Sequence, residues 1–147
     1  MTQQIHGTCV EISNAGVLLR GPSGSGKSDL ALRLIDGGAY LVADDRVDLA
    51  VRNGLLTASA PAALAGMIEV RGLGIMRISA VPRTFISLII DLVERDAVER
   101  MPGPMTCRLL GVEAPLMHLH GKSASAAAWV RLAVDGAKQP ALTVAAL

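Results

Sequence analysis

The chain has 147 residues, the size of one domain, and 51% of them are hydrophobic. Its 14 basic and 13 acidic residues leave a formal net charge of +1, which offers no basic surface for nucleic acid. Its apolar runs are shorter than the roughly 20 residues of a membrane span, and its first residues do not resemble a signal peptide. We therefore expect one cytoplasmic domain over residues 1–147, with neither nucleic acid nor a membrane as a partner.

The first predicted elements are two short strands, residues 8–12 and 16–20, in which aliphatic and β-branched residues are bounded by turn formers. Ser13-Asn14 would join these strands as a hairpin. A glycine-rich loop follows, and apolar residues then recur at helical spacing over residues 30–35. Gly37-Gly38 predicts the end of this helix, which would have about three turns.

A buried strand is predicted next at residues 39–43, and another at 47–51 that Asn53-Gly54 would turn back as a hairpin. Residues 67–71 and 85–93 have the composition of two further strands. The order of strand, loop, helix, strand and hairpin predicts an α/β domain with a mixed sheet and flanking helices.

One more helix is predicted near the C-terminus. Residues 123–135 are rich in alanine and place their larger apolar side chains on one face, and Gly136 predicts the end of the helix. We expect residues 136–147 to form a loosely held tail.

One segment has the G-x-x-x-x-G-K-[S/T] spacing of a phosphate-binding P-loop: Gly21, Pro22, Ser23, Gly24, Ser25, Gly26, Lys27 and Ser28. In such a loop, successive backbone N–H groups and the N-terminus of the following helix bind the phosphates. Lys27 would reach the β and γ phosphates, and the Ser28 hydroxyl would bind Mg²⁺. A predicted strand before the loop and a helix after it supply the required context, so the sequence predicts binding of ATP with Mg²⁺.

Asp44 and Asp45 follow the strand at 39–43, at the position where α/β sheets present groups to a ligand. One carboxylate could accept the proton of an attacking hydroxyl, and the other could hold a metal-bound water or a nearby cation. The alternative is a solvated turn in which Arg46 pairs with one of them, and residue types alone leave both interpretations open.

Glu69 lies between two apolar residues of a predicted strand, so its side chain points to the opposite face together with Arg71. It is either a surface partner of Arg71 or a second metal ligand beside the glycine turn at residues 72–74. The three histidines and two cysteines have no zinc spacing, and residue types alone assign no role to His6.

Taken together, these segments resemble the catalytic domain of HPr kinase/phosphorylase, which phosphorylates a serine of the phosphocarrier protein HPr. The resemblance covers the first half of the chain, and its matching segments are His6-Gly7, the P-loop, residues 41–47 and residues 68–75. The sequences Ala-Asp-Asp-Arg-Val and Glu-Val-Arg-Gly-Leu-Gly-Ile, in this order, are its specific part. The resemblance implies a P-loop α/β fold similar to that of phosphoenolpyruvate carboxykinase.

The resemblance also implies catalytic roles. Asp45 would be the general base that takes the proton of the target serine, and Asp44 would support it. His6 would be the active-site histidine ahead of the P-loop. Arg100 resembles an active-site arginine of the family.

The same resemblance implies the groups that bind the cofactors and the partner. Lys27 would contact the phosphates of ATP, and Ser28 and Glu69 would be the Mg²⁺ ligands. The substrate would be HPr or an HPr-like phosphocarrier of the phosphotransferase system, and self-association is left open.

Two departures from the family pattern qualify these expectations. Only five residues precede His6, so we expect a catalytic domain alone, as in short members of the family. Members that also remove the phosphate by phosphorolysis carry a Pro-Gly-Arg-Asn segment, whereas the stretch after Leu119-His120 is Gly-Lys-Ser-Ala-Ser-Ala. Phosphorolysis is therefore not predicted.

Two other functions remain compatible with a P-loop. One is a kinase that phosphorylates a small metabolite, and the other is a nucleotide-sensing module without catalysis. Replacement of Asp45 by Asn distinguishes the HPr kinase and the metabolite kinase from the nucleotide-sensing module. Either kinase would lose turnover and keep nucleotide binding, whereas the module would keep both nucleotide binding and output.

Overall fold

The computed structural model describes residues 1–138. In chain order its strands are β1 (Thr2–His6), β2 (Thr8–Ile12), β3 (Ala15–Arg20), β4 (Tyr40–Ala43), β5 (Arg46–Arg52), β6 (Leu55–Ser59), β7 (Met67–Val70), β8 (Gly74–Arg77), β9 (Thr84–Leu92), β10 (Thr106–Leu109) and β11 (Val112–Leu119). Its helices are α1 (Lys27–Asp36), α2 (Ala126–Lys138) and two 3₁₀ turns, η1 (Ala62–Leu64) and η2 (Arg95–Ala97).

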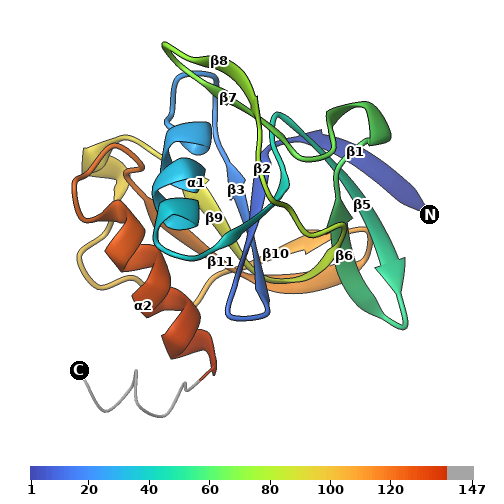
Figure 1. Cartoon of the computed structure of the whole chain (residues 1–147). Helices are drawn as coiled ribbons and strands as arrows, with labels where there is room; N and C mark the ends of the chain where they lie inside the picture. Colours follow the sequence, from blue (N-terminus) through green and yellow to red (C-terminus); the bar gives the residue numbers. More distant parts are fainter. Residues whose placement is uncertain (139–147) are drawn as a thin grey trace.

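Nine strands form one curled, mixed sheet in the order β1-β5-β6-β9-β3-β2-β4, with the β10–β11 hairpin attached to β9 (Figure 1). β9 pairs in parallel with β3 and β11, and its first residues pair antiparallel with β6. β7 and β8 form a separate two-stranded hairpin. β9 therefore ties the strand that precedes the P-loop to the C-terminal hairpin.

The two faces of the sheet contribute to two hydrophobic clusters. The cluster under the helices includes Leu19 and Ile90, which are register partners on β3 and β9, together with Leu30 of α1. The cluster within the curl includes the preceding pair, Leu18 and Ile89. Because successive side chains of a strand point to opposite faces, continuous aliphatic runs in β3 and β9 fill both clusters.

Helix α1 begins at the P-loop and lies beside α2 on one face of the sheet (Figure 1). Its N-cap is Gly26, whose φ of 95° lies in the left-handed region that glycine adopts without strain. Its last turn ends at Asp36, and the amide of Gly37 donates to the carbonyls of Arg33 and Leu34. The predicted end of the helix at Gly37-Gly38 is confirmed.

The two predicted hairpins are present. Asn53 and Gly54, between β5 and β6, both have positive φ, which is the geometry of the tight turn that this dipeptide favours. Ser13 and Asn14 between β2 and β3 also have positive φ. β1 was not predicted from the sequence, because its four exposed residues show no hydrophobic pattern.

The predicted end of the second helix at Gly136 is wrong, because α2 begins at Ala126 and continues through this residue to Lys138. A glycine inside a helix costs only about 1 kcal/mol relative to alanine. Burial of Val130 and Val134 against the sheet offsets this cost. Residues 136–138 of the predicted tail are therefore helical, and residues 139–147 lie outside the described part.

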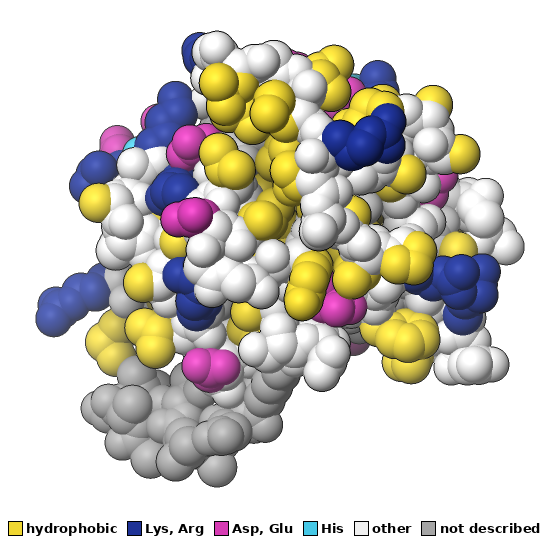
Figure 2. All heavy atoms as spheres, in the orientation of Figure 1, with side chains coloured by type: hydrophobic (Ala, Val, Ile, Leu, Met, Phe, Trp, Pro, Cys, Tyr) yellow, Lys and Arg dark blue, Asp and Glu magenta, His cyan; other side chains and the backbone are white. Residues whose placement is uncertain are grey.

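Basic, acidic and apolar side chains are interspersed over the face drawn in Figure 2. This mixture fits the formal net charge of +1. Within residues 1–138, no helix is both long and apolar enough to cross a membrane.

Candidate active site

The P-loop is shaped by three glycines with positive φ: 159° at Gly21, 84° at Gly24 and 95° at Gly26. The amide of Ser25 donates to the carbonyl of Pro22 at 3.0 Å, which closes the loop on itself. In the described part of the chain, no group accepts a hydrogen bond from the amides of Gly24, Gly26 or Lys27. A loop with unpaired N–H groups at a helix N-terminus fits an anion such as the phosphates of ATP.

Lys27 extends back across the P-loop from the first turn of α1. Its Nζ donates to the carbonyl oxygens of Gly21 at 2.6 Å and Pro22 at 3.2 Å. A lysine held over the loop by carbonyl oxygens stands beside the position that a phosphate occupies in a P-loop. The fold therefore brings the predicted lysine to the predicted loop.

Asp44 links three segments that are far apart in the sequence. Its Oδ1 accepts hydrogen bonds from the hydroxyls of Ser28 at 2.7 Å and Thr8 at 2.9 Å, and its Oδ2 accepts one from the amide of Glu69 at 3.2 Å. The residue is only 5% exposed. Three donors compensate the burial of this carboxylate.

Ser28 and Asp44 together fit a Mg²⁺ ion. P-loop proteins hold Mg²⁺ with the loop Ser or Thr and an Asp at the end of a neighbouring strand, and phosphates and water complete the coordination. No cluster of three His, Cys, Asp or Glu side chains able to hold a metal exists within residues 1–138. In nucleotide sites Mg²⁺ is commonly held by one or two carboxylates together with the phosphates and water.

Asp45 follows in a tight turn between β4 and β5. The amide of Arg46 donates to the carbonyl of Asp44 at 2.8 Å, and Asp45 between them has a φ of 71°. A three-residue turn with positive φ at its centre is rare and strained. Asp45 is exposed, so its carboxylate is available to a ligand while that of Asp44 is buried. Among the described residues, Arg46 forms no ion pair with either carboxylate.

His6 lies beside this turn. It ends β1 opposite Arg46 of β5, and the amide of the next residue, Gly7, donates to the carbonyl of Asp45 at 3.3 Å. The His6 side chain is exposed. The fold thus brings His6, the two aspartates and the P-loop helix to one end of the sheet.

Glu69 and Arg100 are placed differently from these residues. The Glu69 side chain is exposed on β7, and only its backbone amide contacts Asp44. Ile68 is buried, as the predicted alternation requires, and no ion pair joins Glu69 to Arg71 in the described part of the chain. Arg100 is exposed on the connection between β9 and β10, without a hydrogen bond to the other site residues within residues 1–138.

Arg20, the last residue of β3, is fixed just before the P-loop. Its Nε and Nη2 donate to Oδ1 and Oδ2 of Asp91 at 2.7 and 3.0 Å, and the two residues are register partners. The hydrogen bonds that the Arg20 guanidinium donates to Asp91 raise its pKa. This two-point ion pair ties the ends of β3 and β9 together below the loop.

Arg33 of α1 was not predicted as part of the site. Its Nη2 donates to the carbonyl of Gly121 at 2.6 Å, its Nη1 donates to that of Ser123 at 3.2 Å, and Asp29 pairs with its guanidinium at 3.1 Å. The turn after β11 is thereby attached to the P-loop helix. Gly-Lys-Ser occurs both at residues 26–28 and at 121–123, but a repeated tripeptide does not indicate which segments meet.

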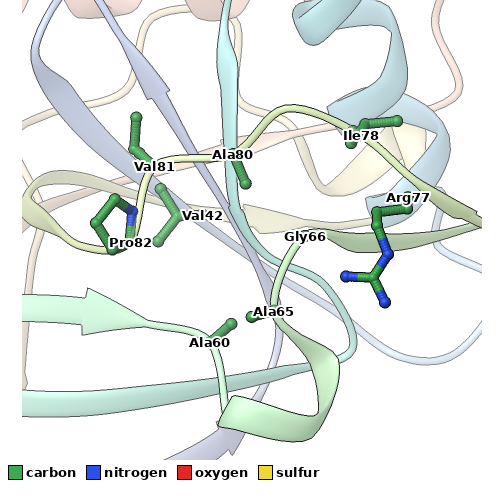
Figure 3. Close-up of a pocket in the computed structure, with 9 residues that line it drawn as sticks. All are labelled: Val42, Ala60, Ala65, Gly66, Arg77, Ile78, Ala80, Val81 and Pro82. Atoms are coloured by element: carbon green, nitrogen blue, oxygen red, sulfur yellow. The ribbon is translucent and has the colours of Figure 1, made fainter.

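A cleft of about 450 Å³ lies away from the P-loop, which contributes no residue to it (Figure 3). Small apolar residues and one arginine line it: Val42, Ala60, Ala65, Gly66, Arg77, Ile78, Ala80, Val81 and Pro82. Val42 and Val81 also belong to the cluster within the curl of the sheet, opposite the helices. The candidate active site is therefore defined by the loop and the aspartates rather than by this cleft.

The sequence model of the protein family described as HPr Serine kinase C-terminal domain matches residues 1–128 of this chain. The chain belongs to this family. A solved structure of the Hpr(Ser) kinase/phosphatase from Coxiella burnetii has the same fold, with a TM-score of 0.83 and 28% sequence identity. The similarity covers 94% of this chain and 97% of that one. The P-loop and the Asp44-Asp45 turn thus belong to an HPr kinase domain, and the resemblance drawn from the sequence is confirmed.

Curated relatives named HPr kinase/phosphorylase are longer than this chain. That of Variovorax paradoxus is 39% identical over an alignment of 121 residues, and the match covers 74% of this chain and 38% of the relative. That of Clostridium kluyveri is 48% identical over 77 residues, or 52% of this chain and 25% of the relative. The chain therefore spans between a quarter and two fifths of the length of these relatives.

Proposed function

We propose that this HPr kinase domain is an ATP- and Mg²⁺-dependent protein serine kinase whose substrate is HPr or an HPr-like phosphocarrier. The observation that carries this proposal is the 2.7 Å hydrogen bond between the Ser28 hydroxyl and Asp44. It joins the P-loop to the end of a neighbouring strand, which is the pair of groups that holds Mg²⁺ in P-loop enzymes. Family membership supplies the class of substrate.

In this proposal, phosphate binding, Mg²⁺ binding and proton transfer are carried out by different groups of the site. The amides of the P-loop and Lys27 bind the phosphates of ATP, and Ser28 and Asp44 hold Mg²⁺, which neutralises charge on the phosphates when it is bound. The exposed carboxylate of Asp45 accepts the proton of the target serine. Its strained turn fixes the carboxylate next to Asp44, and such strain is often found at functional sites.

His6, Glu69 and Arg100 take the supporting roles that the family resemblance implies. His6 lies next to Asp45, where an imidazole orients the carboxylate or the incoming hydroxyl. Glu69 completes the Mg²⁺ ligands, and Arg100 neutralises charge on the transferred phosphoryl group. Because the last two lie on exposed segments, we propose that they reach the phosphates only when substrate is bound.

The test is transfer of labelled γ-phosphate from ATP to a purified HPr-type carrier, with and without Mg²⁺. Asp45→Asn and Lys27→Ala should each abolish serine labelling, and Asp36→Asn, on the exposed end of α1, is the matched control that should keep it. ATP binding without transfer to any carrier would refute the proposal. Transfer to a small metabolite instead would identify a metabolite kinase, and neither transfer would leave a nucleotide sensor.

A further inference from the structure

The turn after β11 packs directly on the P-loop. The amide of Ser123 donates to the carbonyl of His120 at 3.1 Å, which closes a four-residue turn with Lys122 near its tip. A Cβ added at Gly121 would lie 3.0 Å from the carbonyl oxygen of Ser25, and one added at Gly26 would lie 3.5 Å from Cγ of Lys122. The two glycines therefore permit a close approach between these segments.

The position of this turn is fixed from both sides. Arg33 binds the carbonyls of Gly121 and Ser123, as described above. The ring Nδ1 of His120 lies 3.0 Å from the carbonyl of Val93, at the end of β9. The turn is thus held between the P-loop helix and the central strand, and its distance from the loop is set by the fold.

Lys122 differs from Lys27 in being unpaired. The ammonium of Lys27 binds two carbonyls of the loop, whereas Lys122 is exposed and forms no hydrogen bond or ion pair with any described residue. The nearby guanidinium of Arg33 is already paired with Asp29. The stem of Lys122 passes beside Gly26, whose amide is unpaired, so the free ammonium at the end of this flexible stem can reach a phosphate bound at the loop.

We infer that Lys122 is a second phosphate-binding lysine, which contacts the polyphosphate of the nucleotide beside the P-loop. The inference rests on the proposed function, because it requires the loop to bind a nucleotide. Arg33 is then a positioning residue, which holds the turn that carries Lys122. A surface lysine with only a solvent-facing role would neither contact the polyphosphate nor depend on Arg33 for its position.

The test measures binding of Mg-ATP, Mg-ADP and AMP to the wild-type chain and to Lys122→Gln, Lys122→Arg and Arg52→Gln. Loss of a charge-assisted contact should weaken Mg-ATP binding by about 10-fold or more. AMP binding should change by less than about 2-fold, and Lys122→Arg should restore most of the affinity. Arg52→Gln is the charge-matched control, because Arg52 is exposed at the far end of β5 and should bind as the wild type does.

Arg33→Gln supplies a second measurement. It should also weaken Mg-ATP binding. The double variant Arg33→Gln with Lys122→Gln should bind Mg-ATP no more weakly than Lys122→Gln alone, because both changes remove the same contact, that of Lys122 with the polyphosphate. Wild-type affinity for Mg-ATP in Lys122→Gln, or an equal loss for AMP, would overturn the inference. A wild-type chain that binds no nucleotide would refute it together with the proposed function, whereas ATP binding without phosphotransfer would refute the proposed kinase activity alone.

Discussion

The hydroxyl of Ser28 donates a 2.7 Å hydrogen bond to Oδ1 of Asp44, and this contact joins the P-loop to the carboxylate pair after β4. Ser28 lies in the first turn of α1, while Asp44 is buried at the end of a strand. The hydrogen bond holds a hydroxyl and a carboxylate next to each other, and we propose that they bind one Mg²⁺ ion together.

Ser28→Ala should raise the Mg²⁺ concentration that nucleotide binding requires. Removal of a group that hydrogen-bonds a metal ligand commonly lowers metal affinity by about 10- to 100-fold. Loss of a direct ligand should lower it at least as much. The measurement is a Mg²⁺ titration of ATP binding. Ser87→Ala, at an exposed position of β9 outside the P-loop, is the control and should titrate as the wild type does. Equal Mg²⁺ requirements for both variants would contradict the assignment.

Asp44→Asn and Asp45→Asn should have different effects although the residues are adjacent. In the first variant, the side-chain amide would present an N–H group where Asp44 accepts hydrogen bonds from Thr8, Ser28 or Glu69. Its hydrogen bonds to these groups are no longer charge-assisted, which lowers the free energy of unfolding by about 1–3 kcal/mol. Asp45 is exposed, and Asn tolerates positive φ, so its replacement should change stability little while it abolishes phosphotransfer. Urea unfolding of both variants checks this, and equal stability of the two would contradict the buried role of Asp44.

Gly16→Ala should destabilise the junction of β3 and β9. A Cβ at Gly16 would clash with the carbonyl oxygen of Phe85 and lie 2.7 Å from Cγ2 of Thr84, so the strands would have to separate. Overpacking of this kind typically costs about 1–3 kcal/mol, and we expect a loss of at least about 2 kcal/mol. Gly103→Ala is the control, since no atom lies within 4 Å of its added Cβ. A urea midpoint for Gly16→Ala equal to that of the control would show that the strands yield without cost.

Cys9 should make the fold less stable at alkaline pH. Complete burial, and to a smaller extent the charge of Glu11, raises the pKa of the Cys9 thiol far above its ordinary value. The folded chain therefore keeps this proton when the unfolded chain, with a thiol pKa of about 8.5, has lost it. The stabilising effect is complete below a pH of about 8.5 and declines above it, by about 2 kcal/mol at pH 10.

The comparison of wild type with Cys9→Ala isolates this effect. The difference in free energy of unfolding between the two proteins should narrow between about pH 8 and pH 10, because the variant has no thiol at this position. Parallel pH profiles would mean that the Cys9 thiol does not stay protonated in the folded chain. Unfolding in urea at several pH values supplies the measurement.

The local features of this protein were predictable from its sequence. The P-loop, the hairpin turns at Ser13-Asn14 and Asn53-Gly54 and the end of α1 follow from residue preferences over a few positions. Glycine and asparagine adopt the positive φ that these turns need, and the aliphatic runs of β3 and β9 have the composition of buried strands. The α/β fold and the family were therefore predictable before any coordinates.

Contacts between distant segments were decided only by the tertiary structure. Asp44 receives hydrogen bonds from Thr8, Ser28 and Glu69, and no local preference indicates which donors the curl of the sheet brings to one carboxylate. Gly136 was mistaken for a helix end because packing of α2 on the sheet outweighs the small cost of a glycine. Likewise, the turn that carries Lys122 meets the P-loop only because β11 pairs with β9 and Arg33 reaches across to it. Sequence sets the preference of each short segment, whereas burial and hydrogen bonding between segments determine which side chains meet.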